Sequence, residues 1–94
     1  LAILHTTTAT VDLFKALAGE ILPGVEVINI VDDSILPQLA REDGNLAGVE
    51  QRFIQYARYA AQAGADIILE ACSSVGELAG KMQAAVTVPV VRVD

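Results

Sequence analysis

The sequence predicts an α/β fold with a parallel sheet, and three observations support this. Short apolar runs rich in β-branched residues alternate with longer segments of helical periodicity, which is the pattern of consecutive βαβ units. Within the runs, apolar residues follow one another, as in strands covered on both faces. Hydrophobic residues make up 53% of the 94 residues, which suits a doubly covered sheet. We therefore expect a three-layer sandwich with a four-stranded parallel sheet, in the flavodoxin-like order 2-1-3-4, and helices on both faces.

The expected elements follow in order along the chain. Apolar runs bounded by turn residues predict strands at residues 1–5, 25–31, 66–69 and 89–93. Apolar residues at helical spacing predict helices at about 11–21, 34–41, 46–63 and 75–84. Gly24 and Gly64 are expected to end the first and third helices. Asp33 or Ser34 is expected to cap the second, with Pro37 in its first turn.

The charge balance and the cysteine count narrow the classes of function. Six Lys and Arg against twelve Asp and Glu give a net charge of -6, which disfavours nucleic acid and polybasic membrane contacts. No apolar run approaches the length of a membrane span, and no secretory signal pattern is visible. A single cysteine cannot form an internal disulfide. We therefore expect a cytoplasmic location, with neither nucleic acid nor a membrane as partner.

The two ends of the sequence predict that it is part of a longer protein. The chain opens inside the apolar run from Leu1 to Leu4 and stops at Asp94, directly after a strand-like run. Natural domains usually end in polar, mobile residues. We expect residues 1–94 to form a single α/β lobe, the N-terminal part of a two-lobe enzyme. The high apolar share predicts a surface that contacts the other lobe or a second subunit, as in a homodimer.

The strand order predicts where a ligand would bind. Ligands of open α/β sheets bind beyond the carboxyl ends of the strands, near the point where the strand order reverses. In the order 2-1-3-4 the first and third strands are neighbours, so the residues after each would face one another. Cys72, at the start of a predicted helix, is a candidate nucleophile or base, because unpaired N–H groups there stabilise an anion. Alternatively, Cys72 has no chemical role and is a small apolar residue that packs under this helix.

Hydroxyl groups flank the same two strand exits. They either bind an anionic substrate group or cap the helices that follow, and the two roles are compatible. The candidates for substrate binding are Thr7, Thr8, Ser73 and Ser74.

The remaining polar residues at strand ends favour structural roles. Asp32 and Asp33 are adjacent carboxylates, a weak pattern for a cation site, and we expect them at a helix start. For His5 a hydrogen-bonded place at the strand end is favoured over acid–base chemistry. Glycine-rich nucleotide loops, C-x-x-C, H-E-x-x-H and G-x-S-x-G are all absent, so no cofactor and no metal are expected.

The sequence around Cys72 resembles the aspartate/glutamate/hydantoin racemase superfamily. The similarity lies in the strand 66–70 followed by Ala-Cys-Ser-Ser-Val-Gly at 71–76, and in the helix-to-strand join at 59–66. The hydroxyls after the first strand and the segment 29–33 are also similar. The resemblance covers nearly all of the chain, as the first half of a family member. It implies two similar α/β lobes with the active site between them and one cysteine from each lobe.

The resemblance also implies a reaction. One thiolate removes the Cα proton of a carboxylate substrate, and the other thiol returns it from the opposite side, without pyridoxal phosphate or metal. Cys72 corresponds to the first-lobe cysteine, and the four hydroxyl residues correspond to positions that hold the substrate carboxylate. The substrate would be an amino acid such as aspartate or glutamate, or a hydantoin-like compound.

Three alternatives to racemisation stay open. Many racemases have Asn-Thr after this cysteine, whereas Ser73 and Ser74 stand here, and the second cysteine lies outside the chain. Relatives with one working cysteine decarboxylate arylmalonates, and others isomerise maleate by thiol addition. The third alternative is a non-catalytic flavodoxin-like module that binds a ligand.

Overall fold

The computed structural model describes residues 1–94 and contains one parallel sheet of four strands. The strands are β1 (Ala2–His5), β2 (Ile28–Val31), β3 (Ile68–Glu70) and β4 (Val90–Arg92). Ala2 lies beside Ile28 of β2 and Ile68 of β3, and Ile68 lies beside Val90 of β4. The spatial order is therefore β2-β1-β3-β4, and the predicted order 2-1-3-4 is confirmed.

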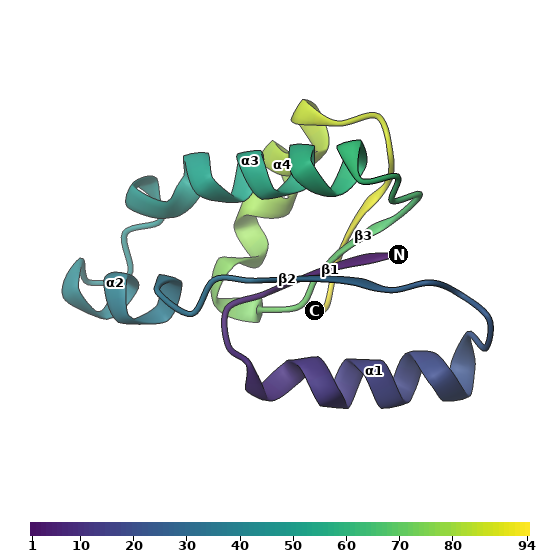
Figure 1. The fold of residues 1–94 in the computed structure, drawn as a ribbon. Helices are drawn as coiled ribbons and strands as arrows, with labels where there is room; N and C mark the ends of the chain where they lie inside the picture. The colour runs from purple at the N-terminus through teal and green to yellow at the C-terminus, as the bar shows by residue number, and fades with distance from the viewer.

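Helices cover both faces of this sheet. They are α1 (Ala9–Ile21), α2 (Ile35–Arg41), α3 (Ala47–Gln62), the 3₁₀ helix η1 (Ser73–Leu78) and α4 (Ala79–Ala85). Helix α1 lies alone on one face, whereas α3 and α4 pack side by side on the other (Figure 1). The three-layer sandwich is thus confirmed. No helix combines the length and the apolar character needed to cross a bilayer.

The main core lies between the sheet and α3 with α4. Helix α3 buries Val49, Phe53, Ala57 and Ala60, which recur at the predicted helical spacing. These side chains meet buried sheet residues such as Leu4 on the same face. Apolar packing on this face therefore holds the strands in place.

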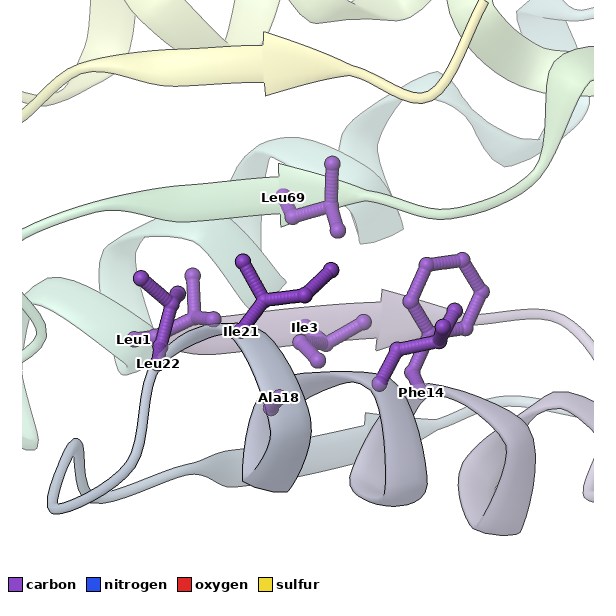
Figure 2. A pocket seen from close by; sticks show the side chains of 8 residues that line it. Leu1, Ile3, Phe14, Ala18, Ile21, Leu22 and Leu69 are labelled. Atoms are coloured by element: carbon purple, nitrogen blue, oxygen red, sulfur yellow. The ribbon is translucent and has the colours of Figure 1, made fainter.

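The face beneath α1 is only partly covered. No residue of α1 is buried, and Ile21 is 70% exposed. A cavity of about 210 Å³ separates α1 from the sheet, and Figure 2 shows Phe14 and Ile21 beside Ile3 of β1, with Leu69 of β3 opposite. Its lining is entirely apolar: Leu1, Ile3, Phe14, Leu17, Ala18, Ile21, Leu22 and Leu69. Part of the exposed apolar surface of the protein lies here, and its contact with a second lobe or subunit stays a prediction.

Several element boundaries differ from those predicted. The second strand begins at Ile28 instead of residue 25, because its ladder with β1 starts only opposite Ala2. The third strand is Ile68–Glu70 instead of 66–69. The helix predicted at 75–84 is two elements, η1 and then α4. Gly76 lies within η1 and has low helix propensity, and a Cβ at this position would come 2.7 Å from the Arg92 guanidinium.

Candidate active site at the carboxyl edge of the sheet

The exits of three strands meet at one edge of the sheet, as the strand order predicts. The Ala71 N–H donates to the Leu4 carbonyl at 3.0 Å, and the Asp32 N–H donates to the His5 carbonyl at 3.0 Å. These bonds extend the ladder by one residue beyond β3 and β2. Thr6 follows β1 directly and Cys72 follows Ala71, so the threonine loop and the cysteine turn leave adjacent strands at the same edge.

Cys72 is a free, half-buried thiol between β3 and η1. Its backbone is extended (φ -120°, ψ 114°), its N–H donates to Glu70 Oε1 at 2.7 Å, and its carbonyl accepts from the Val75 N–H at 3.2 Å. Its side chain packs against the edge of the core. Cys72 therefore fits both interpretations. Its contact with the core suits a packed apolar residue, and its partial exposure suits a nucleophile or base.

The serines beside Cys72 are exposed and cap nothing. Cys72, and not a serine, occupies the N-cap position of η1, and no side chain makes a capping hydrogen bond there. The expectation of a serine cap is wrong because the chain enters a tight 3₁₀ turn instead of an α-helix. A six-residue 3₁₀ helix also supplies less dipole than the expected α-helix. Ser74 borders an open groove of about 540 Å³, whose other lining residues are Leu36, Leu39, Ala40, Asp43 and Gly44.

Of the two threonines predicted to bind substrate, Thr7 has a hydrogen-bonded side chain and Thr8 does not. Thr7 Oγ1 accepts from the Ala9 N–H at 3.3 Å, and the Thr7 carbonyl accepts from the Thr10 hydroxyl. Thr8 stands at the N-cap position of α1 and is exposed, but its side chain makes no capping bond. Thr7 therefore supports the helix start, whereas the Thr8 hydroxyl remains available to a ligand.

His5 is a structural residue, as favoured from the sequence. Its side chain is buried, with Nδ1 2.7 Å from Thr10 Oγ1 and Nε2 2.8 Å from Asn29 Oδ1. The ring also meets Phe14 edge-on, with centroids 6.0 Å apart. Both nitrogens are thus occupied, and the ring fixes α1 and β2 to the end of β1.

Asp32 organises the start of α2 through a hydrogen-bonded cluster. Its carboxylate accepts from the Ser34 N–H at 2.9 Å, from the Tyr56 hydroxyl and from Arg52 Nη1 at 3.3 Å. Burial raises the pKa of Asp32, but the hydrogen bonds from Ser34 and Tyr56 outweigh it and leave that pKa below its usual range. The predicted helix-start role is confirmed for Asp32. Asp33 is exposed, and Ser34 takes the N-cap position without a side-chain cap.

Glu70 lies at the exit of the third strand, among the strand-end positions that the topology selects, but no role was predicted for it. It is the last residue of β3 and is 0% exposed, and its Oε2 has no hydrogen-bond partner. Burial raises the pKa of its carboxyl group to about 7, although the hydrogen bond from the Cys72 N–H acts in the opposite direction. The available signal was a charged residue ending the apolar run Ile67-Ile68-Leu69, directly before the cysteine turn.

The neighbouring strand places one cation near Glu70. Arg92 of β4 is the register partner of Glu70, but its Nε and Nη2 each donate to the Asp94 carboxylate at 3.0 Å. Its charge is therefore largely engaged elsewhere, which explains why it does not hold Glu70 ionised. No group of three or more His, Cys, Asp or Glu side chains is placed to hold a metal ion. Comparisons with protein-family models, curated proteins and solved structures give no match to the chain.

Proposed function

We propose that the protein is a cofactor-independent racemase or isomerase in which the Cys72 thiolate removes the proton alpha to a substrate carboxylate. The observation that carries the proposal is the position of Cys72. A free, partly exposed cysteine stands at the carboxyl edge of a parallel sheet, two residues after the end of the central strand β3 and beside the exit of β1. This is where open α/β sheets bind their ligands.

The surrounding hydroxyls support a carboxylate substrate. Removal of an α-proton leaves an enediolate, which must meet donors already in place, each worth on the order of 10²-fold in rate. Thr8, Ser73 and Ser74 are exposed at this edge, and Thr7 is partly exposed. With a net charge of -6, attraction of an anion must come from such local donors and not from the overall field.

The rest of the proposal follows from the family resemblance. A second acid returns the proton from the opposite face of Cα, and a second lobe or a homodimer partner supplies it. The substrate class is an amino acid such as aspartate or glutamate, or a hydantoin-like compound. A cytoplasmic setting would keep the thiol reduced.

Solvent deuterium incorporation tests this function. The natural gene product that contains residues 1–94 is incubated in D₂O with the L and D forms of aspartate and glutamate, or with a substituted hydantoin. Loss of the Cα proton signal in the NMR spectrum is expected for at least one of them, because a thiolate that takes the proton exchanges it with solvent. Absence of exchange from every compound, in protein shown to be folded, would contradict the proposal.

A further inference from the structure

The carboxyl group of Glu70 is buried without the partners that a charge requires. It lies between Leu4 of β1 and Arg92 of β4, whose guanidinium is paired with Asp94, and one of its two oxygens has no partner. An ionised carboxylate in such a place is strongly unfavourable unless it is paired and hydrogen-bonded. The arrangement is therefore suited to the neutral acid, in which Oε1 accepts from Cys72 and the proton resides on Oε2.

The one contact that Glu70 does make is with Cys72. The 2.7 Å hydrogen bond joins the carboxyl group to the backbone N–H two residues ahead, at the point where the strand turns into η1. Cys72 occupies the N-cap position, and no other side chain bonds to the backbone of the turn there. Glu70 thus fixes the residue that carries the thiol.

We propose that Glu70 is a positioning residue for Cys72, which as the neutral acid holds the cysteine turn closed and as the carboxylate releases it. The inference builds on the proposed role of Cys72, although the contact itself does not require that role. Ionisation of Glu70 strengthens the bond from the Cys72 N–H, but the buried Oε2 has no donor while the turn is closed. Hydration of the carboxylate therefore requires the turn to open, and burial, the larger influence on Glu70, favours that opening. The turn would then open as pH rises through neutrality, in line with the raised pKa of about 7.

The charged groups around Glu70 are consistent with a turn that opens as pH rises. Asp94, beyond β4, favours the neutral acid, whereas Arg92 favours the carboxylate. Glu77 of η1 acts on Arg92, which is already paired with Asp94. The pair Arg92–Asp94 is close to neutral as a unit, so burial remains the largest influence on Glu70.

Amide hydrogen exchange at Cys72 tests the proposal without any substrate. In the wild-type protein, the protection of this amide is expected to fall about tenfold between about pH 6 and about pH 8, after correction for the intrinsic rate, because opening is linked to loss of one proton. The Ala71 amide, which donates to the Leu4 carbonyl, is the internal control and should stay better protected than the Cys72 amide at every pH. Equal exchange rates at the two amides across the pH range would contradict the proposal, since both amides would then report only global unfolding.

Three variants complete the test. Glu70→Gln retains an oxygen acceptor and cannot ionise, so protection at Cys72 should persist across the pH range. Glu70→Leu removes the acceptor, and protection should be lost at every pH. Glu77→Gln alters an exposed carboxylate on the same turn and should behave as the wild type. A pH-dependent fall that survives in Glu70→Gln would overturn the proposal, whereas absence of deuterium incorporation into substrates would count only against the function proposed above.

Discussion

Replacement of Cys72 by alanine is expected to reduce deuterium incorporation into the substrate by about 10²–10⁴-fold, the usual contribution of a positioned acid–base group. The side chain is small and half-buried at the edge of the core, so the variant should fold. Loss of exchange would then report the missing thiol and not a disrupted sheet. The rate is measured by NMR under the conditions that give exchange in the wild-type protein.

A control variant tests whether a change in any polar residue at this edge of the sheet lowers the exchange rate. Asp33 is exposed just after β2 and makes no contact that the account uses, so Asp33→Asn should keep the wild-type rate. If Cys72→Ala also kept that rate, the α-proton would be removed by another group, and Cys72 would have no part in the reaction.

Replacement of Glu70 by glutamine is expected to stabilise the protein above neutral pH by up to about 3 kcal/mol. The carboxyl pKa rises from 4.5, its ordinary value, to about 7 on folding. The folded state therefore binds the proton more tightly than the unfolded state, and wild-type stability falls as pH increases from about 4.5 to about 7. Glutamine has no proton to lose, so the variant avoids this loss while it keeps the acceptor for Cys72.

Urea unfolding at several pH values measures this difference. The free energies of unfolding of wild type and Glu70→Gln should converge near pH 4, separate between about pH 4.5 and about pH 7, and remain apart above that range. Glu77→Gln serves as the matched control, because its carboxylate is exposed and should show no such separation. A constant difference at all pH values would mean that Glu70 is not a buried acid.

The fold was predictable because each level of the sequence agrees with the others. The alternation of β-branched runs with helical periodicity requires parallel strands, and the right-handed crossover rule leaves few orders for four of them. The buried stripe of α3 at Val49, Phe53 and Ala57 follows directly from helical spacing. Strand ends were less predictable, since β2 extends only as far as its partner β1 allows.

The site was predictable in position but not in its detail. Strand order alone brings Thr7 and Cys72 to the same edge, because adjacent parallel strands end together. The 3₁₀ form of the turn after Cys72 was not predictable, because α and 3₁₀ helices share the same apolar spacing over a single turn. The burial of Glu70 was not predictable, because a glutamate is expected to be exposed and only the packing of helices over β3 reveals it.

Stoichiometric alkylation of the wild-type protein tests the role of Cys72 most directly. Peptide mass mapping follows the extent of iodoacetamide labelling at Cys72 separately from that of any other cysteine, and deuterium incorporation is measured on the same samples. The exchange rate is expected to fall in proportion to labelling at Cys72, and a carboxylate substrate is expected to slow this labelling. Full exchange activity in protein whose Cys72 is completely alkylated would contradict the account.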